Sequence, residues 1–411
     1  MSFKDLGLIK PLQKAVEASG YIEPTLVQQR SIPLVLDGKD VIVSAQTGTG
    51  KTAAFALPIL QKLYDKQDAP KKGKKIRALI VSPTRELAVQ IQQNFKTYAE
   101  FTNLKSLVVF GGTSIEPQKD VLKKGVDILV ATPGRLLDLH KQDYINLDYV
   151  ETFVLDEADL MLAMGFIDDV KKIERLCPET KQTLLFSATI PYKIEELANT
   201  ILKNPERIDV TPTKSVAKDV SQVLYYVPKQ SKIELCLHLL RNTIEGNVLI
   251  FRRTKYGVDK LEETLLKNGY AVNSLHGDKA QSERQNALNK FKNGYVKVLI
   301  ATDVAARGID INELDNVLNF DMPNVPETYV HRIGRTGRAG NLGKAYAMCS
   351  ADEKSYVKAI QNSINVQIPV ETEHPYPLDP KAKPVVHKKQ GSKYKKGRKS
   401  EASKKKKKRW Y

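Results

Sequence analysis

The chain has 411 residues, a hydrophobic fraction of 41% and a formal net charge of +18. This length exceeds what one hydrophobic core usually supports, so we expect two globular domains. The sequence has no run of about 18 apolar residues, which excludes a membrane-spanning helix, and its first residues lack the apolar stretch of a secretory signal.

The first predicted strand, residues 41–44, leads into a glycine-rich loop and then a helical stretch at 53–60. Strand, loop and helix in this order are typical of a phosphate-binding loop, in which backbone N–H groups and the helix N-terminus hold a polyanion. Lys51 would reach the β- and γ-phosphates and Thr52 the metal. Ala45 replaces the first glycine of the general pattern. The loop is Ala45, Gln46, Thr47, Gly48, Thr49, Gly50, Lys51 and Thr52.

Short β-rich runs then alternate with helical patterns up to about residue 200. This alternation predicts a parallel sheet with crossover helices. The predicted strands are 78–82, 107–110, 127–131, 153–156 and 184–187.

The strand at 153–156 ends in the acidic tetrad Asp156-Glu157-Ala158-Asp159. Ligands of open α/β sheets bind beyond the carboxyl ends of the strands, where an acid can hold Mg²⁺. A solvated helix cap is the alternative, because Asp often begins helices. Combined with the phosphate-binding loop, the tetrad indicates ATP or GTP hydrolysis.

Three cysteines, Cys177, Cys236 and Cys349, are odd in number and far apart in the chain. Their spacing argues against a disulfide framework and against paired-cysteine zinc sites. We expect buried thiols in a reducing cytoplasm.

Near residue 210 the pattern changes to a polar, β-branched stretch, which predicts an interdomain linker at 211–217. A second alternating series follows, with strands at 223–227, 248–251, 271–275, 298–301, 317–320 and 345–349. It contains no second phosphate-binding loop with a lysine. Instead, three arginines occur within residues 331–338. A surface loop is one interpretation; the other, which we favour, is an arginine finger that reaches the phosphates of the first domain.

The last segment, residues 381–411, has 13 Lys, two Arg and one Glu, which account for +14 of the net charge. Few apolar residues and no helical periodicity predict disorder. We favour nucleic-acid binding by this segment, because clustered positive charge that binds a phosphate backbone releases counterions, which makes binding favourable. The alternative is that the segment only increases solubility. Trp410 and Tyr411 add rings suited to stacking on bases.

Together these motifs resemble the DEAD-box family of ATP-dependent RNA helicases in superfamily 2, over about residues 1–370. Within the family, the short N-terminus, residues 111–115 and the basic tail are most similar to the bacterial RhlE-like subgroup. The resemblance implies an α/β fold of two tandem RecA-like domains, each a mainly parallel sheet flanked by helices. It places the first domain at 1–210, the linker at 211–217, the second domain at 218–372 and a disordered basic tail at 373–411.

The resemblance also implies roles at the nucleotide. Gln28 would bond the adenine edge, Phe3 would stack on its face and Asp310 would reach the ribose, beside the loop from Ala45 to Thr52. Asp156 and Thr52 would hold Mg²⁺, and Glu157 would activate water. The further catalytic residues implied are Lys51, Ser187, Thr189, His331, Arg335 and Arg338.

RNA contacts implied by the resemblance are rich in Thr, Arg and Gly, which suit phosphates and sugars rather than base edges. Recognition would be independent of sequence, with 2′-hydroxyl contacts separating RNA from DNA. The residues are Pro83, Thr84, Arg85, Gly111, Gly112, Thr132, Pro133, Gly134, Arg135, Phe251, Arg252, Thr254, Gln281, Arg284, Thr302 and Gly308.

We therefore expect an RNA-stimulated ATPase that opens short RNA duplexes locally, uses ATP and Mg²⁺, and works as a cytoplasmic monomer. Ribonucleoprotein or ribosome-assembly particles are candidate partners. Two alternatives remain open at this point. One is a processive DNA helicase of the same superfamily. The other is a non-enzymatic RNA-binding or annealing protein dominated by its tail.

Overall fold

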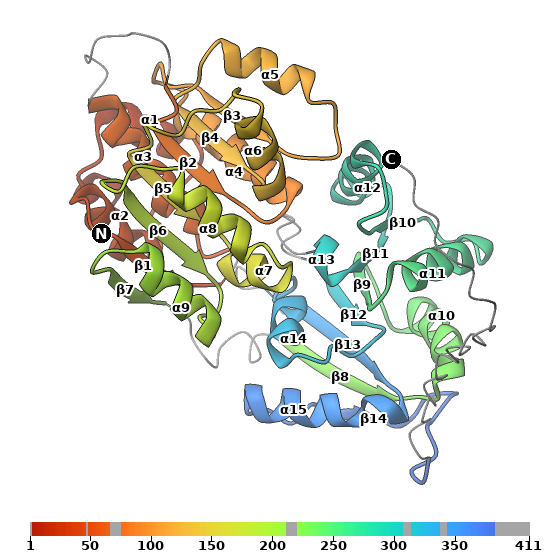
Figure 1. Ribbon diagram of the computed structural model, residues 1–411. Helices are drawn as coiled ribbons and strands as arrows, with labels where there is room; N and C mark the ends of the chain where they lie inside the picture. Colours follow the sequence, from red (N-terminus) through yellow and green to blue (C-terminus); the bar gives the residue numbers. More distant parts are fainter. Residues whose placement is uncertain are drawn as a thin grey trace, which may run out of the picture.

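The computed structural model describes residues 2–46, 48–65, 75–210, 220–306, 314–337 and 343–382. These residues form two α/β domains that lie next to each other (Figure 1), each with a seven-stranded parallel sheet flanked by helices. The predicted fold class is confirmed. Among the described helices, none combines the length and apolar character needed to cross a bilayer.

The first domain follows the predicted alternation of strands and helices. Its strands are β1 (Val41–Ser44), β2 (Ala78–Val81), β3 (Ser106–Val109), β4 (Ile128–Ala131), β5 (Thr152–Leu155), β6 (Gln182–Ser187) and β7 (Glu206–Asp209). Its helices are η1 (Phe3–Leu6), α1 (Lys10–Ala18), α2 (Leu26–Leu36), α3 (Lys51–Asp65), α4 (Arg85–Tyr98), α5 (Glu116–Lys123), α6 (Pro133–Lys141), α7 (Ala158–Ala163), α8 (Ile167–Arg175) and α9 (Tyr192–Ile201).

The second domain repeats this alternation. Its strands are β8 (Val220–Tyr226), β9 (Val248–Arg252), β10 (Val272–Leu275), β11 (Val298–Thr302), β12 (Asn316–Asn319), β13 (Gly343–Cys349) and β14 (Val370–Glu371). Its helices are η2 (Lys229–Ser231), α10 (Lys232–Asn242), α11 (Lys255–Lys267), α12 (Gln281–Lys292), α13 (Asp303–Ala306), α14 (Pro326–Ile333), η3 (Ala351–Glu353) and α15 (Lys354–Ile364).

The two sheets have the same strand order. The first runs β3-β4-β2-β5-β6-β1-β7 and the second β10-β11-β9-β12-β13-β8-β14, so each strand of one domain has a counterpart seven strands later. All described strand pairs are parallel. The loops after equivalent strands therefore occupy equivalent places in the two domains.

Both faces of each sheet are buried under helices. In β1, Val41 and Val43 belong to one apolar cluster and Ile42 to another, because successive side chains of a strand point to opposite faces. In β9, Ile250 and Phe251 divide in the same way. Burial on both faces explains why these strands read as continuous apolar runs rather than as alternating ones.

Every predicted strand is present, with ends displaced by up to three residues. The edge strands β7 and β14 were not predicted. The predicted linker, 211–217, lies outside the described residues. Order in the second domain extends past the predicted boundary at 372: Leu378 N–H donates to the carbonyl of Tyr226, and Tyr376 packs against the core.

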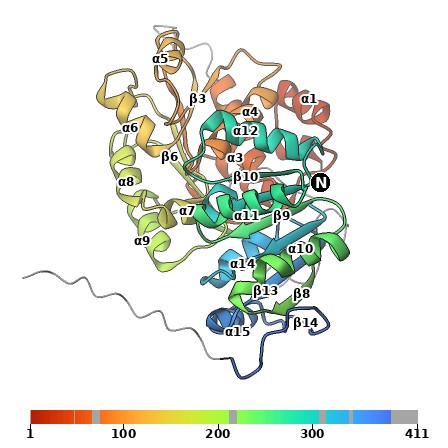
Figure 2. The same cartoon turned by 90° about the vertical axis from the view of Figure 1, so that its right-hand side faces the viewer.

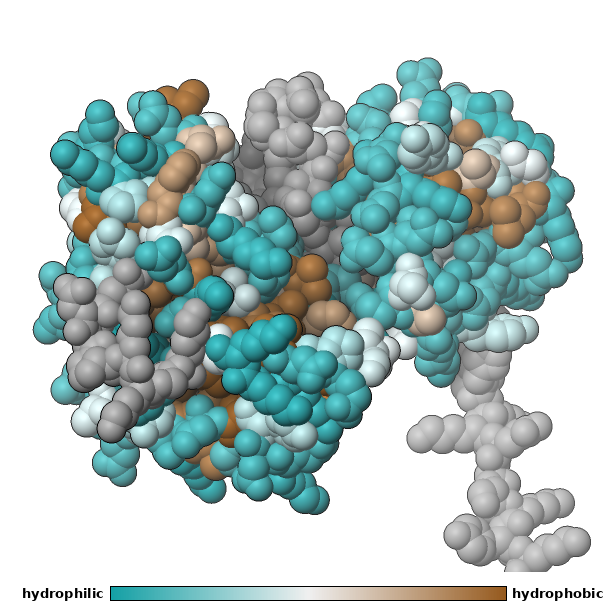
Figure 3. Space-filling model, turned by 90° about the horizontal axis from the view of Figure 1, so that it is seen from above, coloured by the Kyte–Doolittle hydropathy of each residue, from teal (hydrophilic) through white to brown (hydrophobic). Residues whose placement is uncertain are grey.

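Viewed from above, the two domains form separate lobes (Figure 3). Their visible surface is mainly hydrophilic, and apolar side chains occur in scattered patches. Turned by 90° about the vertical, the helices of the second domain lie in front of those of the first (Figure 2). Residues of both domains line two cavities between the lobes.

Asp40, just before β1, connects β6 to the loop that precedes β7. One carboxylate oxygen accepts from the Thr183 N–H at 2.8 Å and the other from the Lys203 N–H at 2.7 Å. The side chain is buried. It therefore satisfies two backbone donors at the end of the sheet opposite the phosphate-binding loop.

Asp40→Ala should lower the free energy of unfolding of the first domain by about 2–4 kcal/mol, because two backbone donors lose their acceptor. Urea unfolding followed by circular dichroism measures this change. Asp37→Ala, at an exposed position three residues earlier, is the control and should shift stability by no more than about 0.5 kcal/mol. Equal effects of the two substitutions would contradict this role for Asp40.

Candidate active site and nucleic-acid interface

The described part of the phosphate-binding loop joins β1 to α3, as the sequence predicts. Ala45 N–H donates to the Ser187 carbonyl at 3.0 Å, and the Thr49 hydroxyl donates to the Gln46 carbonyl at 2.7 Å. Gly50 has φ +87°, and a Cβ there would collide with the Gln28 amide. Glycine is therefore required at position 50 by both conformation and space.

Gln28 connects helix α2 to this loop. Its Oε1 accepts from the Thr25 N–H at 3.0 Å, and its Nε2 donates to the Gly50 carbonyl at 3.2 Å. An amide offers two N–H groups and two acceptor lone pairs, so one of each remains for an adenine edge. Phe3 is buried and stacks on Tyr21, with ring centroids 6.3 Å apart.

The acidic tetrad follows β5 and faces the loop. Lys51 Nζ lies 2.7 Å from Glu157 Oε1, and both side chains are buried. Burial lowers the pKa of Lys51, but the neighbouring carboxylates Glu157 and Asp156 outweigh it, and the net pKa is raised. Lys51 therefore keeps its positive charge although it is buried.

Asp156 lies deeper than Glu157. Burial raises its pKa to about 7, against the opposing charge of Lys51 and with the aid of Glu157. Its Oδ1 has no hydrogen-bond partner among the described residues. A buried carboxylate oxygen without a partner is costly unless a proton or a cation satisfies it.

Glu157 adopts a left-handed backbone conformation, φ 55° and ψ 53°, where β5 passes into α7. Such a conformation is strained for a residue other than glycine and persists only where the surroundings enforce it. It turns the chain sharply at the end of the strand. This turn places Glu157 against Lys51 and the rest of α7 in the interdomain cleft.

Asp159 binds the loop after β6. Its Oδ2 accepts from both the N–H and the hydroxyl of Thr189, at 3.1 and 2.9 Å, and its own N–H donates to Ser187 Oγ at 3.1 Å. Ser187 Oγ in turn donates to the Thr189 carbonyl at 2.7 Å. The structure thus brings together two motifs about 30 residues apart.

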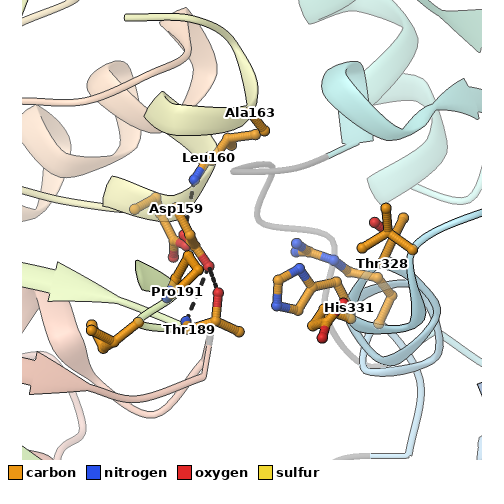
Figure 4. Close-up of a pocket in the computed structure, with 12 residues that line it drawn as sticks. Asp159, Leu160, Ala163, Thr189, Pro191, Thr328 and His331 are labelled. Carbon is orange, nitrogen blue, oxygen red and sulfur yellow. Dashed lines mark hydrogen bonds between the residues drawn. The ribbon is translucent and has the colours of Figure 1, made fainter. Parts of the chain in front are cut away.

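A cavity of about 520 Å³ lies between the domains at this point, and we call it the tetrad cavity. Figure 4 shows Asp159 and Thr189 on one wall and His331 and Thr328 on the other. The first domain contributes Glu157 and Asp159, and the second contributes Glu327, His331 and Arg335. Its lining residues are Glu157, Asp159, Leu160, Ala163, Thr189, Ile190, Pro191, Val325, Glu327, Thr328, His331 and Arg335.

A second interdomain cavity, also about 520 Å³, contains many of the predicted RNA contacts; we call it the arginine cavity. Eight of those contacts line it, and seven of them belong to the first domain. Apolar residues after α7 complete one wall. Its lining residues are Pro83, Thr84, Arg85, Glu86, Gly111, Thr132, Gly134, Arg135, Asp138, Met164, Phe166, Gly277, Arg284, Val304 and Ala305.

Glu86 joins the two sides of the arginine cavity. Its carboxylate accepts from Gln281 Nε2 at 2.9 Å and lies 3.0 Å from Arg284 Nη2. Burial lowers the pKa of Arg284, against the charge of Glu86. Glu86 directly follows the predicted contact Arg85, but the sequence did not predict this interdomain pair, since its partners lie about 195 residues away.

Two other predicted RNA contacts in the first domain support the wall of the arginine cavity. Gly112 has φ +74° and passes so close to the Arg85 guanidinium that a Cβ would collide with it. Pro133 is buried at the first turn of α6. Its ring suits this position because no N–H is needed there.

The remaining predicted contacts in the second domain do not line this cavity. Phe251 is only 2% exposed, and the Arg332 guanidinium covers its ring at 5.0 Å, so its place favours support over direct contact with RNA. Arg252 pairs with Asp321 at 2.9 Å. Thr254 caps α11 by accepting from the Gly257 N–H, and Thr302 is half-buried at the end of β11.

Arg332 was not predicted as a site residue. Its Nε lies 2.6 Å from Asp303 Oδ1 and its Nη2 lies 2.8 Å from Oδ2, which makes a bidentate ion pair. Asp303 begins α13 beside the arginine cavity, and Arg332 lies in α14 beside the tetrad cavity. The run of arginines was visible in the sequence, but its pairing with Asp303 was not. The predicted residues Thr47, Gly308, Asp310 and Arg338 lie outside the described residues.

Comparison with known proteins gives matches along most of the chain. The family model for the DEAD/DEAH box helicase matches residues 25–198, and that for the helicase conserved C-terminal domain matches residues 231–340. CshA, a DEAD-box ATP-dependent RNA helicase of Bacillus subtilis, is 44% identical over 363 residues, 88% of this chain and 72% of that protein. The RNA helicase CrhR of Synechocystis is 43% identical over 370 residues, 90% of this chain and 74% of that protein.

Solved structures match as well. Dbp5 of S. cerevisiae bound to RNA and ADP BeF3 has 31% identity and a TM-score of 0.81, with 90% of this chain and 95% of that chain covered. Mss116p bound to ssRNA and AMP-PNP has 30% identity and a TM-score of 0.82, with 91% and 79% covered. A DEAD box protein from Methanococcus jannaschii has 37% identity and a TM-score of 0.52, with 90% and 99% covered.

The relatives named CshA and CrhR do not support the RhlE-like assignment. That expectation was based on the short N-terminus, residues 111–115 and the basic tail. A short glycine-containing segment and a basic tail are compositional features that carry little subgroup information. The family-level resemblance is supported instead by the motifs of both domains.

Asp156 should make stability depend on pH. Its pKa in the folded chain, about 7, exceeds its ordinary value of 3.8, so the folded state keeps a proton that the unfolded chain has released. Its contribution to stability is therefore lost as pH rises from about 4 to 7. Between pH 5 and pH 8, without Mg²⁺ or nucleotide, we expect a loss of about 2–3 kcal/mol in the wild type that Asp156→Asn does not show.

Urea unfolding at the two pH values measures this difference. The exposed Asp148→Asn is the control and should follow the wild type. Parallel pH dependence in the wild type and Asp156→Asn would show that the carboxyl of Asp156 does not titrate in this range.

Proposed function

The chain belongs to the DEAD-box family of ATP-dependent RNA helicases, and from this premise we propose how its two interdomain cavities divide the RNA-dependent ATPase reaction. ATP is hydrolysed in the tetrad cavity, and RNA is bound in the arginine cavity. One observation carries this assignment: Glu157 of the first domain faces His331 and Arg335 of the second across a single cavity. Hydrolysis therefore requires both domains.

The phosphate-binding loop and α3 bind the triphosphate. Backbone N–H groups at the helix N-terminus attract the phosphates, and Lys51 supplies a buried cation. Gln28 uses its remaining donor and acceptor on the adenine edge, and a glutamine amide distinguishes adenine from guanine. Phe3 contributes apolar surface beside this edge. Asp310, outside the described residues, reaches the ribose.

Mg²⁺ fits the residues present. Asp156 offers a buried carboxylate oxygen without a described partner, and the neighbouring hydroxyl of Thr52 is half-buried. Both are hard oxygen donors of the kind Mg²⁺ prefers. No group of three or more His, Cys, Asp or Glu suited to a metal occurs among the described residues. Mg²⁺ characteristically retains waters and substrate phosphates as its other ligands, and it neutralises phosphate charge.

Glu157 acts as the general base. A carboxylate at the end of a rigid strand can take the proton of a water molecule while its oxygen attacks the γ-phosphorus. The bond from that phosphorus to the bridging oxygen breaks, and ADP leaves with the electron pair. Arg335, together with Arg338, stabilises the charge that develops on the γ-phosphoryl group. His331, Ser187 and Thr189 couple the state of this site to the rest of the molecule.

RNA lies along the loops that follow β2, β3 and β4 and along the facing residues of the second domain. Arg85, Arg135 and Arg284 bring positive charge to this cavity, and threonine hydroxyls and glycine backbone suit phosphate and sugar contact. The RNA-bound Dbp5 and Mss116p structures match with TM-scores above 0.8. This agreement supports a described domain arrangement close to the RNA-bound form. Bending of the bound strand on closure opens an adjoining duplex.

We further propose a cytoplasmic monomer that acts on RNA within ribonucleoprotein or ribosome-assembly particles. All three cysteines are free and buried, which suits a reducing compartment. Residues 383–411, outside the described part, add affinity for RNA through their charge.

Glu157→Gln should bind ATP and RNA but lose about 10²- to 10⁴-fold in RNA-stimulated turnover, because glutamine cannot take the proton. Single-turnover hydrolysis and fluorescence binding with labelled ATP measure the two effects separately. Glu179→Gln makes the same charge change at an exposed position and should turn over normally. Normal turnover by Glu157→Gln would refute the assignment of the general base.

Removal of residues 383–411 should weaken RNA binding and reduce its dependence on salt while RNA-stimulated hydrolysis remains. RNA affinity at several salt concentrations measures the slope. Replacement of Lys404 to Lys408 by serine keeps the length but removes five charges, so the slope of log affinity against log salt should fall by up to about 3.5. An unchanged slope in both variants would exclude a role for the tail in RNA binding.

A further inference from the structure

The tetrad cavity and the arginine cavity share a wall made by one short segment of the first domain. Asp159, Leu160 and Ala163 line the first cavity, and Met164 and Phe166 line the second. The division falls between two adjacent residues, 163 and 164. Helix α7 and the turn after it therefore extend from the acids of the tetrad to the predicted RNA site, and Figure 1 shows α7 beside α13 and α14 of the second domain.

The turn that ends α7 is rigid. Phe166 N–H donates to the Met161 carbonyl at 2.9 Å, and Gly165 N–H donates to the Leu162 carbonyl at 3.1 Å. With Gly165 at φ +78°, these two bonds form a Schellman motif. Phe166 packs against the same apolar cluster that contains Met161, which is 1% exposed. A displacement of Phe166 is therefore transmitted to α7 rather than absorbed by the turn.

The other end of α7 is equally constrained. Leu160 and Met161 donate to the carbonyl of Glu157 at 3.0 and 3.1 Å, so the proposed base lies in the first turn of the helix. Asp159 is held by the bonds from Thr189 and to Ser187 described above. The helix has only six residues, so its two ends move as one body.

Apolar residues of the second domain complete the arginine cavity opposite this turn. Val304, 51% exposed, and Ala305 lie in α13 and line the cavity together with Met164 and Phe166. These four residues provide apolar surface in a cavity whose other lining residues are mostly charged, threonine or glycine. A nucleotide held on the arginines would be limited on this side by the Phe166 ring.

We propose that Phe166 is a positioning residue through which RNA in the arginine cavity sets the orientation of Glu157 and Asp159. Occupancy of the cavity presses on the turn of residues 164–166, and the rigid helix carries this displacement to the tetrad. RNA then raises the rate of the hydrolytic step and not only the extent of domain closure. This inference depends on the role proposed above for Glu157, and the Glu157→Gln measurement tests that role independently.

The test is RNA-stimulated ATP hydrolysis by the full chain with Phe166→Ala, over a range of single-stranded RNA concentrations. At saturating RNA, kcat should fall about 10- to 100-fold, because small misplacements of catalytic groups are costly. The RNA concentration for half-maximal stimulation should change less than about twofold. Phe166→Leu, which keeps an apolar contact with the core, should recover most of kcat. Phe101→Ala, at a 45% exposed position away from both cavities, is the matched control.

Gly165→Ala is the second variant. It leaves the Phe166 ring in place and has room for a Cβ, but it strains the left-handed turn, so kcat should fall while RNA affinity is kept. Thermal unfolding confirms that each variant is folded. Weaker RNA binding with unchanged kcat in Phe166→Ala would make Phe166 a simple RNA contact and overturn the proposal. Unchanged kcat in both variants would overturn it as well.

Discussion

Parallel strands of one sheet all end at the same edge, and this constraint determines where chemistry can occur in the chain. The sheet buries both faces under helices, so most site residues lie in the loops beyond that edge or on the helices that begin there. Arg335 is an exception, because its carbonyl accepts from the Leu314 N–H ahead of β12. Both domains bring their loops to a common cleft, where two cavities are lined by residues of each. The phosphate-binding loop, the tetrad and the arginine motif become one site only through this arrangement.

The identical strand order explains how the cleft is divided. Loops after the second, third and fourth strands of the first domain line the arginine cavity, and the loops after their counterparts β10 and β11 in the second domain contribute Gly277, Val304 and Ala305. The segment after β5 supplies Glu157 and Asp159 to the tetrad cavity, and the loop after β6 supplies Thr189. Opposite them, α14 follows β12, the counterpart of β5, and supplies His331, while Arg335 lies in the turn just beyond this helix. Equivalent loops thus meet at equivalent ends of the cleft, although only the first domain keeps a phosphate-binding lysine.

Much of this arrangement could be predicted from the sequence. Central strands such as β1 and β9 are continuous apolar runs, and the phosphate-binding loop and the tetrad follow such runs directly. The edge strands β7 and β14 were missed because β7 buries only one residue and β14 has two residues. Edge strands need little apolar surface, so they leave a weak pattern.

Side-chain partners were harder to predict than positions. Asp159 was recognised as part of the tetrad, but its bonds to Thr189 depend on the parallel pairing of β5 with β6. The interdomain pairing of Glu86 with Arg284 and the burial of Phe251 depend on tertiary packing, which local motifs do not encode. The RhlE-like assignment was not supported for a related reason. It was based on the composition of short segments and of the tail, whereas the information about the family lies in the motifs.

The ion pair between Lys51 and Glu157 has a consequence for the order of events. Glu157 Oε1, which lies 2.7 Å from Lys51 Nζ, already accepts a hydrogen bond from the ammonium group, so that oxygen is not free to receive a water molecule. The same ammonium is the group that a triphosphate would draw toward itself. When the phosphates draw Lys51 away, Glu157 Oε1 loses this hydrogen-bond donor and becomes free to accept from a water molecule. Binding of the triphosphate would thus free Glu157 to act on the attacking water. In the absence of nucleotide, Glu157 stays paired with Lys51.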